Sequence, residues 1–469
     1  MTNVRKTHVD LTNSWRTLTA LMLTAIVIAG IAATTAAQAQ TYTDLFDFDS
    51  THGWYSRNPE LLAQGPDGLL YGTTSGGGLH QSGTAFSTTP DGDLTVLYNF
   101  DGIHGAGPYC GFTLGIDNYF YGATGGGTYG YGTIFKITRG GKLTTLYNLT
   151  ATDGAIPNAP PIQAADGNFY GLTAEGGVDG KAYKITPSGE FTVLGTIPGV
   201  SVAPLMQASD GNFYAGTYVG DPKLGCATSG CVFKLTPQGV ISVIYNFDGT
   251  HGAGVYPPLV QGNDGYLYGN TISGGKYGQG VIFRLTAGGL TVLHDFGDTP
   301  GDGAQPVAGM ILAVNGNFYG VTTAGGTVGA GIIFQISPSG AYSILYNFDG
   351  TNGANPWPTP VQHTNGKIYG ITYDGGNFGG GVLYSFDYGL APFIKLVSQT
   401  GRIGKAVEIL GQGFTGATSV AFNGVAASFT IKSDTFLSAT IPTGATTGFV
   451  TVTTLTGTLS SSQKFLVKP

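Results

Sequence analysis

The sequence predicts an all-β protein made from one repeated unit. After residue 40, Gly, Thr, Tyr and Phe dominate and runs of strong helix formers are nearly absent, a composition that favours short strands joined by tight turns. One tyrosine recurs at intervals of 44 to 54 residues, at Tyr71, Tyr121, Tyr170, Tyr214, Tyr268, Tyr319 and Tyr369. A period in this range indicates one supersecondary unit that is repeated in space and stabilised by its neighbours.

Each repeat contains four strand signals. In the fifth copy we expect strands at residues 258–262, 266–272, 281–286 and 290–296. Asp264-Gly265 separates the first two, and Asp-Gly or Asn-Gly recurs at this position in other copies. These dipeptides suit two-residue hairpins because both central residues need positive φ. Four antiparallel strands in about 50 residues are typical of a β-propeller blade.

The two ends of the repeat array complement each other. Residues 42–48 resemble the fourth strand of a repeat, and no first, second or third strand precedes them. The last copy has its first three strands, ends near Tyr388 and lacks the fourth. The sequence therefore predicts a seven-bladed β-propeller at residues 40–390 that is closed by an N-terminal strand. Closure would hide the two sheet edges that invite aggregation.

Segments of different composition flank the array. Residues 1–39 combine a basic start, an apolar stretch and the small-residue site Ala37-Gln38-Ala39, which is the pattern of a secretory signal peptide. A membrane anchor is the alternative, but the apolar stretch is short for a span. Residues 391–469 alternate apolar and polar residues in short runs separated by Gly, Thr and Ser, which predicts a small immunoglobulin-like β-sandwich.

Charge excludes one class of partner. The chain carries a net charge of −7. Removing residues 1–39, which hold three basic residues and one acidic residue, leaves −9. An acidic exported chain lacks the basic footprint that nucleic-acid binding requires, and we expect no membrane span in the mature chain.

The three cysteines divide into a pair and a single residue. Cys226 and Cys231 lie in one loop, so we expect a disulfide between them in an exported protein. No His or carboxylate accompanies them at ligand spacing, which argues against a metal site. We expect Cys110 to be a buried thiol.

Long loops on one predicted face carry the candidate ligand-binding residues. The connectors between repeats and the loops between second and third strands share that face, and binding residues usually lie on loops that a rigid scaffold presents. The candidates are Asp49, His52, Asp101, His104, Asp248, His251, Asp349 and Trp357. A structural role for the recurring His is the alternative, because the last copy has Asn352 at that position.

No motif predicts a catalytic residue, a cofactor or a metal. The Gly-rich loops join two strands, whereas a dinucleotide-binding fingerprint needs a following helix. Patterns of the GxSxG and HExxH type do not occur in the sequence, and neither does the spacing of a nucleophile triad.

The repeat resembles the Gloeo/Verruco (GloVer) repeat family, which occurs as tandem arrays in exported bacterial proteins. The resemblance covers residues 42–389 and is carried by LYNFDG at Leu97–Gly102 and Leu345–Gly350, and by DGNFYG at Asp166–Gly171. It implies a propeller and no established reaction.

The C-terminal segment resembles the IPT/TIG domain over residues 393–467. The matching residues are Val407–Phe414, Val420–Gly424, Ala439–Pro442 and Gly448–Val452. In exported bacterial proteins this resemblance implies a spacer or an adhesive module.

Together these patterns favour an exported, non-catalytic binding or adhesion protein. We expect its rim to bind glycan, such as polysaccharide, or cell-envelope protein. The mature chain is then a monomer that is secreted, periplasmic or on the cell surface. A polysaccharide lyase or glycoside hydrolase of propeller type is one alternative, since the rim carries carboxylates and His. A purely structural envelope component is the other.

Overall fold

The strands of each repeat pair in chain order to form one antiparallel sheet. The computed structural model describes residues 40–54, 62–174 and 180–468, so the predicted signal peptide at residues 1–39 lies outside the described residues. Thr41–Pro469 form one compact unit. Within the described ranges, seven four-stranded sheets come from the repeats.

Six of these sheets each take four strands from a single copy. The first three sheets are β2 (Ala63–Gln64), β3 (Leu70–Thr74), β4 (Thr84–Thr88) and β5 (Leu94–Asn99); β6 (Thr113–Leu114), β7 (Phe120–Thr124), β8 (Thr133–Ile137) and β9 (Leu143–Asn148); and β10 (Ile162–Gln163), β11 (Phe169–Leu172), β12 (Lys181–Ile185) and β13 (Phe191–Thr196). The next three are β15 (Met206–Gln207), β16 (Phe213–Gly216), β18 (Cys231–Leu235) and β19 (Ile241–Asn246); β20 (Val260–Gln261), β21 (Leu267–Thr271), β22 (Val281–Thr286) and β23 (Gly289–Asp295); and β25 (Ile311–Leu312), β26 (Phe318–Thr322), β28 (Ile332–Ile336) and β29 (Tyr342–Asn347).

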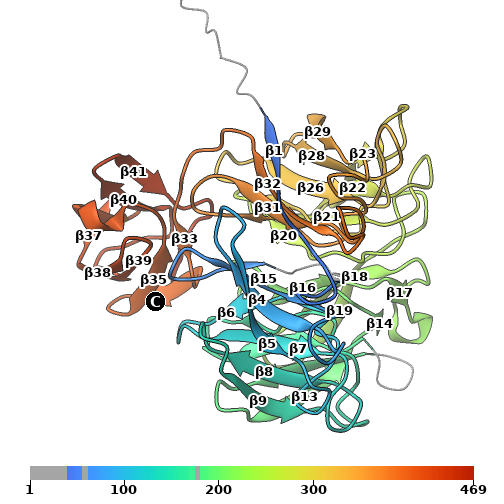
Figure 1. Ribbon diagram of the computed structural model, residues 1–469, viewed down its shortest axis with the longest axis horizontal. Coiled ribbons are helices and arrows are strands. Elements are labelled where there is room, and N and C mark those ends of the chain that lie inside the picture. The colour runs from blue at the N-terminus through green and yellow to red at the C-terminus, as the bar shows by residue number, and fades with distance from the viewer. Residues whose placement is uncertain (1–39, 55–61, 175–179, 469) are drawn as a thin grey trace, which may run out of the picture. The chain divides into compact units, whose positions relative to one another are not determined.

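The seventh sheet joins the two ends of the repeat array. It contains β30 (Val361–Gln362), β31 (Ile368–Ile371) and β32 (Val382–Asp387) from the last copy, and β1 (Thr41–Asp47) pairs antiparallel with β32. Figure 1 shows β1 beside β32 and β31. The Tyr42 ring stacks on Tyr346 of the sixth sheet at 4.2 Å between centroids. The leading strand therefore completes the last sheet, as the sequence predicted.

Aromatic side chains of the inner strands form the contacts between sheets. Tyr268 in β21 lies 4.3 Å from Phe318 in β26, centroid to centroid, and both rings are fully buried. The fourth strands are partly exposed along their length. Apolar faces on both sides of each sheet are thus covered by its neighbours, which explains why the second strands are apolar throughout.

The Asp-Gly turns hold the recurring tyrosines. The Tyr71 hydroxyl donates to Asp67 at 2.7 Å, and Tyr214 donates to Asp210 at 2.8 Å. Burial, with Asp210 as acceptor, raises the pKa of Tyr214 to about 12. The turn carboxylate has a structural partner, which accounts for its recurrence without a bound calcium ion.

Glutamines of the first strands link neighbouring sheets. The Gln207 side chain accepts from the Ala165 amide of the preceding sheet at 3.0 Å and donates to the Gly211 carbonyl of its own turn at 3.0 Å. Between the first and seventh sheets, Gln64 accepts from the Thr364 amide and donates to the Thr364 hydroxyl. The same type of contact therefore links adjacent sheets and joins the two ends of the array.

The C-terminal segment forms two further four-stranded sheets around one apolar core. One sheet has the order β33 (Lys395–Leu396), β35 (Ala406–Leu410), β39 (Phe436–Thr440), β38 (Phe429–Ser433), and the other has the order β37 (Val425–Ala427), β36 (Ser419–Phe422), β40 (Val450–Thr454), β41 (Gly457–Ser460). β34 (Thr400–Arg402) pairs in parallel with β42 (Leu466–Lys468). Ile409, Phe422 and Val452 are among the residues of the shared core.

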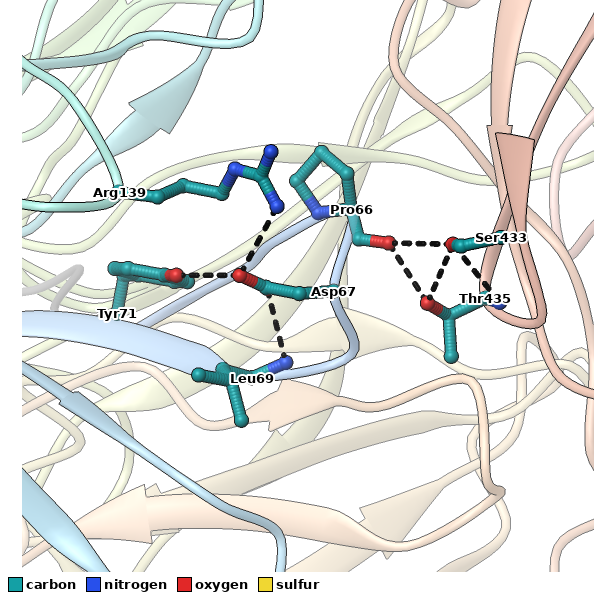
Figure 2. Close-up of polar contacts among 7 residues, drawn as sticks. All are labelled: Pro66, Asp67, Leu69, Tyr71, Arg139, Ser433 and Thr435. Atoms are coloured by element: carbon teal, nitrogen blue, oxygen red, sulfur yellow. Dashed lines mark hydrogen bonds and ion pairs between the residues drawn. The ribbon is translucent and has the colours of Figure 1, made fainter.

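Polar contacts join this segment to the first repeat. The hydroxyls of Ser433 and Thr435 donate to the Pro66 carbonyl at 3.4 and 2.7 Å. Next to Pro66, Asp67 accepts from Tyr71 and from Arg139 of the second repeat. Figure 2 shows both groups of contacts around one turn, so this turn is fixed from two sides.

Smaller elements mark the irregular copies. Two-residue strand pairs occur at β14 (Gly199–Val200) with β17 (Val219–Gly220) and at β24 (Gly303–Ala304) with β27 (Ala324–Gly325). Short 3-10 helices are η1 (Pro222–Leu224) and η2 (Phe414–Gly416). In the described part of the chain, no helix is long and apolar enough to cross a membrane.

Candidate functional site

Two kinds of loop leave opposite ends of each sheet. In an antiparallel sheet, the turns after the first and third strands lie at one end, and the loops after the second and fourth strands lie at the other. The first kind is short, as between β20 and β21, whereas β21 and β22 are separated by residues 272–280. We call the end with the longer loops the long-loop face.

Each predicted Asp–His pair on this face closes its own turn. His52 Nδ1 lies 2.8 Å from Asp49, His104 Nδ1 lies 2.6 Å from Asp101, and His251 Nδ1 lies 2.7 Å from Asp248. In each pair the His backbone amide also donates to the same carboxylate. Asp349 has the same geometry with the Asn352 amide.

These local bonds also set the charge state of the carboxylates. Backbone and side-chain hydrogen bonds from His251 lower the pKa of Asp248. Burial opposes ionisation of Asp101, but the bonds from His104 lower the pKa of Asp101 as well. The structure therefore assigns each pair a turn-stabilising contact, and a ligand-binding role for these residues stays a prediction. The described residues contain no group of three or more His, Cys, Asp or Glu that could hold a metal ion.

The sixth connector uses a buried carboxylate for the same purpose. Asp302 accepts from His294 Nε2 at 3.1 Å and from the Tyr342 hydroxyl at 2.8 Å, and only 2% of its side chain is exposed. His294 stacks on Tyr342 with 3.7 Å between ring centroids. The backbone amides of Gly297, Asp298 and Gly303 also donate to Asp302.

Trp357 belongs to an aromatic group that joins distant repeats. Its ring lies 6.1 Å from Tyr256 and 6.1 Å from Tyr373, and Tyr256 lies 5.9 Å from Tyr218, all between centroids. Tyr256 precedes β20 and Trp357 precedes β30, so connectors of the fifth and seventh sheets meet. We call Tyr218, Tyr256, Trp357 and Tyr373 the aromatic cluster. Tyr218 is 42% exposed and the other three are half-buried.

A glycine of the intervening repeat allows this approach. A Cβ atom at Gly309 would lie 2.6 Å from the Pro258 side chain and 2.9 Å from the Thr359 hydroxyl. The Gly309 amide donates to that hydroxyl at 2.8 Å. Gly309 therefore brings the residues that follow Tyr256 and Trp357 together, because any side chain there would push them apart.

The disulfide lies beneath one end of the aromatic cluster. Cys226 and Cys231 are joined, as the sequence predicted, and both are fully buried. Thr217, the residue before Tyr218, has its hydroxyl 3.2 Å from Cys226 Sγ and accepts from the Cys231 amide. The link thus fixes the loop that presents Tyr218. Cys110 is a buried thiol outside the disulfide.

Sequence reasoning named Trp357 but missed the rest of the aromatic cluster. One signal was present, because an aromatic residue followed by Pro occupies the same position before the first strand in Tyr256-Pro257 and Trp357-Pro358. Periodicity places both residues on connectors. It does not show that connectors two repeats apart touch.

Comparison with solved structures supports a β-propeller-like fold. The BP39L lectin from Burkholderia pseudomallei is similar over 71% of this chain and 96% of its own, with a TM-score of 0.52 and 9% identity. XC5397 from Xanthomonas campestris, described as a gluconolactonase, is similar over 76% of this chain and 93% of its own, with a TM-score of 0.39 and 14% identity. No curated protein sequence matches the chain.

The family comparison covers most of the sequence. The profile of the Gloeobacter/Verrucomicrobia repeat matches residues 29–220 and 201–428. These two overlapping matches span the whole repeat array that forms the seven sheets. The chain therefore belongs to the Gloeobacter/Verrucomicrobia repeat family.

Proposed function

We propose that this chain is an exported, non-catalytic binding protein whose long-loop face binds glycan. In this proposal residues 1–39 are a signal peptide, residues 40–390 form a seven-bladed propeller, and residues 391–469 form an immunoglobulin-like domain of IPT/TIG type. The C-terminal domain acts as a spacer or as a second contact. The mature protein is a secreted, periplasmic or surface-bound monomer.

The pairing of strands supports this division of the chain. Seven four-stranded sheets among the described residues correspond to seven blades, and β1 beside β32 corresponds to the closing strand. Two sheets that share one core are the arrangement expected of a small sandwich. The resemblance of residues 393–467 to the IPT/TIG domain rests on the motifs given above.

The aromatic cluster is the observation that carries the proposed activity. Aromatic faces are apolar and bear a negative quadrupole, so they attract the slightly positive C–H groups of a sugar ring. Polar groups adjoin the rings, since the Asn355 amide donates to the Asp374 carboxylate at 2.7 Å. An apolar surface with a few fixed polar groups is the usual composition of a small-molecule site. The net charge of −7 favours neutral over acidic glycans.

A glycan array with the purified mature chain tests the proposal. We expect binding to a subset of neutral polysaccharides, and we expect Trp357→Ala to weaken it about tenfold, since one aromatic contact contributes up to about 1.5 kcal/mol beyond its buried area. Tyr266→Ala is the matched control, because Tyr266 is an exposed aromatic residue of a short turn at the opposite end of the sheets.

Two results would contradict the proposal. One is equal affinity of Trp357→Ala and Tyr266→Ala for every bound glycan, which would remove the aromatic cluster from the site. The other is release of shorter sugars from a bound polysaccharide, which would identify a lyase or a hydrolase. A glycan array without any bound ligand would favour a structural envelope component.

A further inference from the structure

We propose that the chain has a second ligand site, which binds a small amphipathic organic anion. The site is a cavity of about 550 Å³ that lies between the first strands of the third to fifth sheets and the C-terminal segment. Cavities of about 300–1,000 Å³ hold small-molecule ligands. We call it the basal cavity and define it by its apolar wall, Leu205, Met206 and Leu259, and by its polar end, Gln399, Lys464 and Lys468.

The apolar wall comes from the inner strands of the repeats. Leu205 and Leu259 are 2% and 4% exposed, and Met206 in β15 is half-buried. Val397, which follows β33, and Leu466 in β42 cover the cavity from the C-terminal segment. A ligand in contact with this wall would need an apolar body, because burial of apolar surface is the favourable contribution that such a wall offers.

The polar end carries a local excess of positive charge. Lys464 Nζ donates to the Asn263 carbonyl at 3.1 Å, which holds its ammonium group at the rim. Lys468 in β42 is half-buried and lines the same cavity. Asp264 is the one carboxylate of the lining, and it already accepts from the Tyr268 hydroxyl and the Tyr266 amide.

This charge runs against the balance of the whole chain. The chain has 27 acidic and 20 basic residues, yet the basal cavity has two lysines beside one engaged carboxylate. Ammonium groups at the edge of an apolar wall favour a ligand with an anionic head and an apolar body. A carboxylate on an alkyl chain combines the two features.

A second cavity repeats this chemistry on the other side of Val397. It has a volume of about 290 Å³, its wall includes Phe112 and Ile311, and Lys395 lines it. Val397 borders both cavities. The first strands of several sheets thus present apolar side chains to one C-terminal segment, and lysines of that segment lie at the edges.

Titration calorimetry of the full mature chain with dodecanoate tests the proposal. Dodecanol and dodecyltrimethylammonium are the uncharged and cationic probes. We expect dodecanoate to bind at least about tenfold more tightly than either, since a charge-assisted contact contributes about 1.5–3 kcal/mol. Lys468→Gln should weaken dodecanoate about tenfold and leave dodecanol unchanged.

Two further variants separate loss of the site from loss of the fold. Met206→Trp fills the basal cavity and should abolish binding of all three probes, while the thermal midpoint and glycan binding show whether the chain is still folded. Lys223→Gln removes an exposed lysine of η1 outside the cavity and should bind dodecanoate like the wild type.

Three outcomes would overturn the proposal. They are no binding of dodecanoate by the wild type, equal binding of the anionic and cationic probes, and unchanged affinity in both Lys468→Gln and a folded Met206→Trp. The proposal does not depend on glycan binding, because the aromatic cluster and the basal cavity share no residue and Trp357→Ala should leave dodecanoate affinity unchanged.

Discussion

Replacement of Asp302 by Asn should destabilise the protein more than any other Asp→Asn change on the long-loop face. Its two carboxylate oxygens accept from five donors: His294, Tyr342 and the amides of Gly297, Asp298 and Gly303. An Asn side chain keeps one acceptor and turns an NH₂ group toward donors on the other side. Several buried donors would then lose their acceptor.

The magnitude follows from burial. With 2% of the Asp302 side chain exposed, water cannot replace the lost bonds, and removal of one partner from a buried charged network costs about 3–5 kcal/mol. Asp248→Asn is the control, because it breaks an Asp–His pair of the same type in which both side chains are 53% exposed. Exposed pairs contribute less than about 1 kcal/mol.

Urea-induced unfolding, followed by fluorescence and circular dichroism, measures the difference. Hydrogen exchange of the β23 amides provides a local readout, since this strand carries His294. A cost for Asp302→Asn within about 0.5 kcal/mol of Asp248→Asn would refute the reasoning, because it would mean that the buried donors find other acceptors.

The pH dependence gives a second check on Asp302. Burial opposes ionisation, but hydrogen bonds from His294 and Tyr342 lower the pKa of the carboxyl below its ordinary value. A lowered pKa in the folded state stabilises the protein above the unfolded pKa of about 3.9 and is lost as the pH falls through the folded pKa. The stability gap between wild type and Asp302→Ala should therefore be full near neutral pH and shrink below about pH 4. A gap that stayed constant from neutral pH to pH 2 would contradict the assignment.

Three other substitutions test the scaffold. Gln207→Leu removes two hydrogen bonds at the junction of the third and fourth sheets and should cost about 1–2 kcal/mol in urea unfolding; no measurable cost would show that the glutamine contact is dispensable. Tyr384→Phe removes a fully buried hydroxyl that has no hydrogen-bond partner among the described residues, so the thermal midpoint should stay equal or rise, and a clear fall would reveal a missed partner. Replacing both Cys226 and Cys231 by Ala opens a short loop and should cost about 2 kcal/mol, with faster hydrogen exchange near Tyr218; unchanged exchange would mean that the loop is held without the disulfide.

The strands of the repeats could largely be predicted from the sequence. The expected strand at 281–286 has the bounds of β22, whereas the expected strand at 258–262 shortens to β20, Val260–Gln261. The Pro residues before β20 have no amide hydrogen to give to a ladder, and Gly262 already belongs to the turn, where its amide donates to Tyr266. Around the C-terminal core the sequence indicated some seven strands, and the described residues contain ten, because short pairs such as β34 with β42 have no clear periodicity.

The candidate site was harder to predict, because its residues come from different repeats. The recurring Asp and His residues stood out by their repetition, yet each pair bonds within its own turn, which needs no partner from another copy. Tyr256 and Trp357 lie 101 positions apart (357 − 256) and meet through the space that Gly309 leaves. Their contact depends on the paths of three connectors.

The sequence by itself determined the repeated four-strand unit, the turns between its strands and the match between the leading strand and the incomplete last repeat. These features follow from local periodicity, from turn residues that accept positive φ and from the count of strands at each end. Only the tertiary structure decided which side chains of distant repeats face one another, as in the aromatic cluster and the basal cavity. Such contacts arise where sheets and loops converge in space, and the order of residues along one repeat does not specify that convergence.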